Sequence, residues 1–230
     1  MKTIGLIGGM SWESTITYYQ LLNEAAKEKL GGLHSAKILL YSVDFFEVEA
    51  LMSRGDWDAA AELLGDVAAR LERAGADFIL ICTNTLHKVA PQVQASIHVP
   101  LVHIAEAAAE ELCEHGITRV ALLGTKYTMT QDFYRNKLTE RGIDILIPEG
   151  DDIELVNRVI FDELCLGVVK SESKKEYLRV IDTLRQRGAQ AILLGCTELG
   201  LIVSQSDVAL PLFDTTLIHA KKAAELAFPV

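Results

Sequence analysis

"RAGADFILICTNT", residues 73–85, contains the end of a helical segment, a Gly-Ala turn, an apolar run and a polar turn. "QRGAQAILLGCTE", residues 186–198, repeats the same order. Gly75 aligns with Gly188, an offset of 188 − 75 = 113 residues. A helix that feeds an apolar strand twice in one chain predicts two similar α/β units.

The repeat extends beyond these two stretches. "TIGLIGG" at 3–9 resembles "RVALLGT" at 119–125, and "VPLVHI" at 99–104 resembles "LPLFDT" at 210–215. A chain of 230 residues is long enough for two domains of about 100 residues each. We therefore expect residues 1–102 to form the first half, with 210–230 returning to it, and residues 103–209 to form the second half.

Apolar runs alternate with longer amphipathic stretches along the whole chain. The candidate strands are 3–8, 37–43, 77–82, 100–104, 119–124, 143–148, 190–195 and 209–214, and the candidate helices are 11–30, 56–75, 105–116 and 174–188. This alternation predicts an α/β fold in which each half is a parallel sheet flanked by helices. We expect the halves to be related by a pseudo-twofold axis, with the active site between them.

Composition and cysteine spacing exclude several functions. A net charge of −10 argues against general nucleic-acid binding, which needs a basic face. No uncharged apolar run approaches the ~18 residues of a membrane span, and no signal segment is visible, so we expect a cytoplasmic protein without a membrane partner. The closest cysteines are 113 − 82 = 31 residues apart, which does not fit a zinc site or a disulfide scaffold, and Cys113 reads as a buried small residue.

The polar turns after the two repeated strands carry the candidate chemistry. Cys82 is the obvious nucleophile or base in the first turn, but the offset of 113 aligns Thr83 with Cys196, and Cys82 with Gly195. Side chains alternate between the faces of a strand, so Cys82 and Thr83 should point in different directions. The repeat therefore favours Thr83 as the counterpart of the Cys196 thiol.

Both turns lie where parallel sheets bind ligands, at the carboxyl ends of strands. If each turn leads into a helix, the free N–H groups there bind a carboxylate and lower the pKa of a thiol. Asn84, Thr85 and Thr197 add short polar donors. Glu198 would raise the thiol pKa but could hold an ammonium group. One acid/base group in each half suits proton transfer at a carbon next to a carboxylate.

Four motifs together resemble the aspartate/glutamate racemase superfamily: "IGGMSWEST" at 7–15, "CTNTLH" at 82–87, "LLGTKYTM" at 122–129 and "GCTE" at 195–198. The resemblance covers nearly the whole chain. It implies a homodimeric, cofactor-independent enzyme without a metal, built from two α/β halves that each contribute a cysteine. "GGMSWEST" and "GCTE" look like the aspartate-racemase branch.

The sequence departs from that pattern in two places. The family's first Cys-Asn-Thr motif reads Thr83-Asn84-Thr85 here, which resembles a Thr/Cys branch described as L-aspartate/glutamate-specific or broad-specificity racemases. A lysine that the resemblance implies for the distal carboxylate is replaced at "FDELCLG" by Cys165.

Residues outside the two turns are candidates for substrate binding as well. Arg54 is a candidate substitute for the missing lysine, although its residue type more often indicates a solvated surface charge. Met52 is a candidate to line the same loop, and Met10 either contacts substrate or belongs to the core. His87 is a candidate to orient the first motif or to cap a helix.

We expect a racemase of aspartate, glutamate or a similar small amino acid, with Thr83 and Cys196 serving opposite faces of Cα. The alternatives are a decarboxylase or isomerase of the same superfamily that uses one thiol, and a non-catalytic protein that binds or senses an amino acid.

Overall fold

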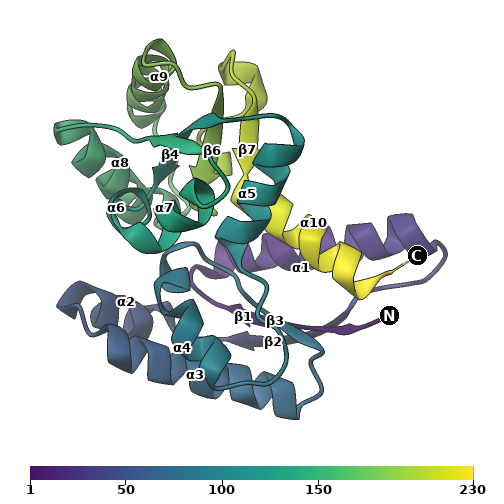
Figure 1. Cartoon of the computed structure of the whole chain (residues 1–230). Coiled ribbons are helices and arrows are strands. Elements are labelled where there is room, and N and C mark those ends of the chain that lie inside the picture. Colours follow the sequence, from purple (N-terminus) through teal and green to yellow (C-terminus); the bar gives the residue numbers. More distant parts are fainter. Residues whose placement is uncertain (230) are drawn as a thin grey trace. The chain divides into compact units, whose positions relative to one another are not determined.

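The computed structural model describes residues 1–229, and the chain forms two compact units. The first unit comprises residues 1–104 and 219–229, and the second comprises residues 105–218. The chain thus crosses from the first unit to the second after Ile104, and returns after Ile218. Figure 1 shows the elements of each unit.

A three-stranded parallel sheet in the order β2-β1-β3 forms the centre of the first unit. Its strands are β1 (Thr3–Gly8), β2 (Lys37–Ser42) and β3 (Phe78–Ile81). Leu101 adds a parallel bridge to Ile79 beside β3, so the predicted strand at 100–104 is reduced to a single bridged position.

Helices cover both faces of this first sheet (Figure 1). Side chains of α1 (Trp12–Leu30) and of the C-terminal part of α10 (Thr215–Ala227) pack on one face, against Ile4, Leu6 and Leu80. The other face, with Ile7 and Ile79, is covered by α2 (Phe45–Arg54), α3 (Trp57–Arg73) and α4 (Ala90–Ala95). The strands are apolar on both sides because both sides are buried, as in other parallel sheets.

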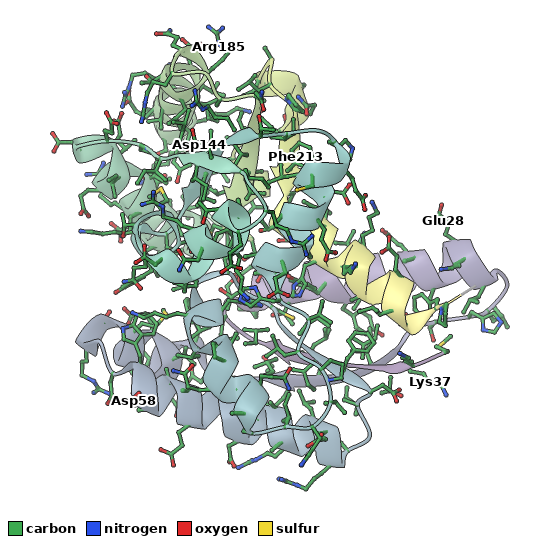
Figure 2. The ribbon with its side chains drawn as sticks, in the orientation of Figure 1. Glu28, Lys37, Asp58, Asp144, Arg185 and Phe213 are labelled. Carbon is green, nitrogen blue, oxygen red and sulfur yellow. The ribbon has the colours of Figure 1, made fainter. Side chains whose placement is uncertain are left out.

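The second unit contains a four-stranded parallel sheet in the order β5-β4-β6-β7. Its strands are β4 (Arg119–Gly124), β5 (Asp144–Leu146), β6 (Ala191–Gly195) and β7 (Leu212–Asp214). Figure 2 labels Asp144 on β5 and Phe213 on β7, the two outer strands.

The helices α8 (Asp151–Asp162) and α9 (Ser171–Gln186) pack against the face of this sheet that carries Ala121, Leu123 and Ile192. The remaining elements of the unit are α5 (Ile104–Glu114), α6 (Lys126–Thr130), α7 (Asp132–Thr139) and the short 3-10 helices η2 (Leu164–Leu166), η3 (Leu199–Leu201) and η4 (Gln205–Asp207). The N-terminal residues of α10 complete it.

The two sheets have the same strand order, which confirms the predicted α/β fold with parallel sheets flanked by helices. β2-β1-β3 followed by Leu101 corresponds to β5-β4-β6-β7. Even a single backbone bond repeats: Ile79 N–H donates to Pro100 O at 2.9 Å, and Ile192 N–H donates to Pro211 O at 2.9 Å. The internal repeat in the sequence is therefore a repeat in the structure.

One expectation about the fold is wrong. Cys113 lies in α5 as expected, but it is exposed rather than buried, and its Sγ lies 3.9 Å from Arg141 O. No helix among residues 1–229 is long and apolar enough to cross a membrane.

Candidate functional site

Cys82 is fully buried in the core of the first unit. Its side chain is 0% exposed and belongs to the cluster formed by β1, β3, α1 and α10. Burial raises the pKa of its thiol, since the charged thiolate loses its hydration there. Cys82 thus behaves as a small core residue, and its thiol is poorly suited to removing a proton.

Strand alternation separates Cys82 from its neighbour. Phe78, Leu80 and Cys82 belong to one core cluster, while Ile79 and Ile81 belong to the cluster on the opposite face. Continued two residues beyond the end of β3 at Ile81, the same alternation places Thr83 in the row of Ile79 and Ile81. Thr83 is half-buried and so is more accessible as a residue than Cys82.

The second unit shows the corresponding row with a thiol at its end. Ile192, Leu194 and Cys196 belong to one cluster, and they align with 79, 81 and 83 at the offset of 113. Gly195, the counterpart of Cys82, lies against β4: a Cβ there would come within 3.0 Å of Leu123 O. A side chain before Cys196 would push β4 and β6 apart, which explains the glycine of "GCTE".

A carboxylate accepts hydrogen bonds from both polar groups of the second turn. The Cys196 thiol donates to Glu198 Oε2 at 3.0 Å, and the Thr197 hydroxyl donates to the same oxygen at 2.8 Å. Cys196 is 7% exposed and Glu198 is 4% exposed. The structure therefore brings Cys196, Thr197 and Glu198 together as one hydrogen-bonded group.

The electrostatics of Cys196 differ from the expectation that a helix N-terminus lowers its pKa, and agree with the expected effect of Glu198. The second turn continues into the three-residue 3-10 helix η3, and the first into η1 (Thr85–Val89), so neither thiol nor hydroxyl faces the N-terminus of a long α-helix. Burial raises the pKa of Cys196 well above its usual value, and the neighbouring carboxylate of Glu198 raises it further. Cys196 is a protonated donor in this state.

Two residues near Cys196 complete the second unit's site. Cys165 lies half-buried in η2, packs against the cluster that contains Cys196, and contributes to the raised pKa of that thiol. Asp214 ends β7 and accepts a 2.7 Å bond from Thr216 N–H at the start of α10. Burial raises the pKa of Asp214, and the negative charge of Glu198 raises it further.

Asp214 was missed in the sequence, although a signal was present. In the repeat "VPLVHI"/"LPLFDT", Asp214 aligns with His103, so both halves place a titratable residue two positions after the leucine that pairs with β3 or β6, Leu101 or Leu212.

The first turn is anchored by backbone and side-chain bonds. Asn84 is 2% exposed, and its backbone carbonyl oxygen accepts a 3.1 Å hydrogen bond from the backbone N–H of His87. Thr85 is 4% exposed. His87 Nδ1 lies 2.7 Å from the carbonyl oxygen of Thr83, so the imidazole holds the backbone of the candidate catalytic residue. His87 is therefore buried and bonded to the first turn rather than facing solvent.

Backbone geometry fixes the "GGMS" turn of the first unit. Gly9 has φ of +90°, and its N–H donates to Thr15 Oγ1 at 2.8 Å. A Cβ on Gly9 would lie 2.3 Å from Val43 O, so the position excludes every other residue. Met10 follows with its side chain 2% exposed in the core cluster.

The two α2 residues proposed to contact the substrate side chain have different surroundings in the structure. Met52 is 4% exposed and packs in the same cluster as Met10. Arg54 is exposed in the last turn of α2, directly before the left-handed Gly55. The two residues therefore point into different environments.

Among residues 1–229, no group of three or more His, Cys, Asp or Glu side chains is arranged to hold a metal ion. All four cysteines are free thiols.

The Asp/Glu/Hydantoin racemase family model matches residues 7–223. Among curated proteins, the chain is 23% identical over 227 residues to the broad-specificity amino-acid racemase RacX of Bacillus subtilis, covering 95% of each chain.

Solved structures resemble the whole chain. A Yersinia pestis protein assigned to the Asp/Glu racemases is 53% identical, with a TM-score of 0.93 and 99% of each chain covered. An aspartate racemase homologue from Pyrococcus horikoshii is 40% identical, with a TM-score of 0.85 and 99% of each chain covered.

Proposed function

The chain belongs to the Asp/Glu/Hydantoin racemase family, and from that premise we propose that it is a cofactor-independent racemase of aspartate, glutamate or a similar small amino acid. The observation that carries the proposal is that Thr83, which follows β3, aligns at the offset of 113 with Cys196, which follows β6, and that the Cys196 thiol is bonded to Glu198. In this mechanism one group removes the α-proton and the other supplies a proton to the opposite face.

Glu198 has two roles in this proposal. Without substrate its carboxylate keeps the Cys196 thiol protonated through the 3.0 Å bond. The α-ammonium group of an amino acid bound beside Glu198 would neutralise that carboxylate and so remove part of the cause of the raised thiol pKa. Substrate binding thereby makes it easier for the thiol to lose its proton to solvent, and the resulting thiolate is the base that removes the α-proton.

Thr83 acts on the other face of Cα, and Asn84, Thr85 and Thr197 bind the α-carboxylate. Met10 and Met52 form the apolar floor behind the substrate, and Arg54 meets a distal carboxylate when the substrate has one. The exposed position of Arg54 makes it the least constrained of these contacts, so small neutral amino acids remain substrate candidates.

Two enantiomers in water have an equilibrium constant of one, so kcat/KM must be equal in the two directions. A threonine hydroxyl is a far weaker acid than a thiol, and this difference should therefore appear only in the separate kcat and KM values. Unequal kcat/KM values would indicate a net reaction other than racemisation.

The test is chiral chromatography of L- and D-aspartate, L- and D-glutamate and homoserine, each incubated with purified protein and no added cofactor. We expect racemisation of at least one pair, lost in Cys196→Ala and in Thr83→Ala. Cys113→Ala is the matched control, because that thiol is exposed in α5, and it should leave the rate unchanged.

The single-thiol alternative makes a different prediction. A decarboxylase would need Cys196 but would keep its activity in Thr83→Ala, and it would release CO₂ from a substituted malonate. Heat stabilisation by an amino acid without any change in its configuration would instead indicate a binding or sensing protein.

A further inference from the structure

Two buried histidines and one half-buried histidine form a network next to the first turn. His87 and His219 are 1% and 0% exposed, and their ring centroids are 5.8 Å apart. His103 lies against His87, with a centroid distance of 4.5 Å. The hydroxyl of Tyr18 on α1 lies 2.8 Å from His219 Nδ1.

The hydrogen bonds determine the tautomer of each bonded ring. Ile104 N–H donates to His87 Nε2 at 3.1 Å, so that nitrogen carries no proton and Nδ1–H donates to Thr83 O. His219 Nε2 lies 2.8 Å from the carbonyl oxygen of Val102, which only accepts, so Nε2 carries the proton and Nδ1 accepts from Tyr18. Both imidazoles are neutral in this arrangement.

Residues of this network lie at both points where the chain crosses between the two units. Ile104 is the last residue before the first crossing, and His219 is the first residue after the second. Ile104 also begins α5, so its N–H has no partner within that helix and is satisfied by His87 instead. One imidazole therefore joins the start of α5 to the backbone of Thr83.

We propose that His87 is a positioning residue for Thr83, which fixes the first catalytic turn to the crossing at Ile104 through a single neutral imidazole. This inference rests on the proposed racemase function. Thr83 O accepts the Nδ1–H bond, so loss of the ring frees the residue whose hydroxyl must meet Cα. A displacement of about 1 Å in a reacting group lowers its rate roughly a hundredfold.

Cys196 belongs to the other unit, where its thiol donates to Glu198. When Thr83 is displaced, Cys196 should still remove the α-proton of the enantiomer that it serves. In D₂O the thiol exchanges its proton with solvent and returns deuterium to the same face. The result is α-deuterium incorporation without inversion, which a general loss of stability would not produce.

The experiment compares two rates for each variant in D₂O: α-proton exchange by proton NMR, and inversion by chiral chromatography. We expect His87→Ala to raise the ratio of exchange to inversion roughly tenfold or more. His87→Asn keeps a donor at the position of Nδ1 and should restore much of the wild-type ratio. His87→Gln offers an acceptor at the position of Nε2 but no donor to Thr83 O, and should restore less.

The matched control is His34→Ala, since His34 is exposed in the turn between α1 and β2, and its ratio should equal that of the wild type. The proposal is overturned if His87→Ala lowers exchange and inversion by the same factor, or if it changes neither. If His87→Ala does not fold, the other two variants are compared. A ratio of exchange to inversion closer to the wild type in His87→Asn than in His87→Gln supports the proposal, and the reverse order overturns it.

A second measurement does not depend on activity. Proton–nitrogen NMR of the wild type should show a proton on Nδ1 of His87 and none on Nε2. A proton on Nε2 would overturn the proposal. Wild-type protein that carries the proton on Nδ1 of His87 but exchanges no α-proton would instead contradict the racemase function. The anchoring of the turn by His87 would still stand.

Discussion

Replacing Glu198 with glutamine should lower the pKa of the Cys196 thiol, because the carboxylate that opposes its ionisation is removed. The Sγ–Oε2 distance is 3.0 Å. Two unit charges about 3 Å apart repel by roughly 5.5 kcal/mol at an effective dielectric constant of about 20, and by roughly 1.4 kcal/mol in bulk water. Removing this repulsion should therefore favour the thiolate by between about 1.4 and 5.5 kcal/mol, which lowers the pKa of Cys196.

The thiol pKa is measured from the pH dependence of thiolate ultraviolet absorbance in a background where Cys196 is the single cysteine. That background carries Cys82→Ala, Cys113→Ser and Cys165→Ser, and the last change also removes a thiol that contributes to the raised pKa. Although its thiol ionises more easily, Glu198→Gln should racemise more slowly, since it has lost the group proposed to hold the substrate ammonium.

Thr197→Val is the matched control. It removes the second hydrogen bond to Oε2 but leaves the charge of Glu198 in place, so the pKa of Cys196 should move much less than in Glu198→Gln. An unchanged or higher thiol pKa in Glu198→Gln would refute the electrostatic reasoning.

Three other predictions concern stability and the choice of thiol. Cys82→Ala should keep racemisation while lowering the free energy of unfolding by about 1 kcal/mol, because it removes a fully buried side chain; loss of activity in the folded variant would mean that the register is wrong. Burial lowers the pKa of His87 to about 4 and of His219 to about 3, so the unfolded state binds more protons below about pH 6.5. Stability should therefore be fully present above that pH and fall by up to about 1.4 kcal/mol per histidine per pH unit down to pH 4, as measured by urea unfolding; a flat profile would contradict this. Gly9→Ala should cost at least about 2 kcal/mol more than Gly32→Ala, since both have positive φ but a Cβ clashes with backbone only at Gly9; equal costs would show that the turn relaxes.

Much of the fold could be predicted from local pattern. β1 and β4 lie at the predicted residues, because both are apolar runs that end at a glycine where a Cβ would clash with neighbouring atoms. Helix α10 was not predicted: it begins with Thr215 and Thr216, which are poor helix formers, and is started by the Asp214 carboxylate. Helix α4 has six residues, too few for a helical period to be recognised.

The candidate site divides in the same way. The repeat and strand alternation distinguished Thr83 from Cys82, since both depend on spacing alone. The raised pKa of Cys196 was only half anticipated, because the 3-10 geometry of η3 depends on packing. The bond between Tyr18 and His219 joins residues 201 apart in sequence, and no local pattern encodes it.

The most direct test of the central claim is proton NMR of L-aspartate, L-glutamate and small neutral amino acids in D₂O with the purified protein and no added cofactor. The account predicts that the α-proton signal of at least one amino acid disappears, that Cys196→Ser abolishes this loss, and that Cys82→Ser does not. An unchanged α-proton signal with every amino acid, or a loss that depends on Cys82, would contradict it.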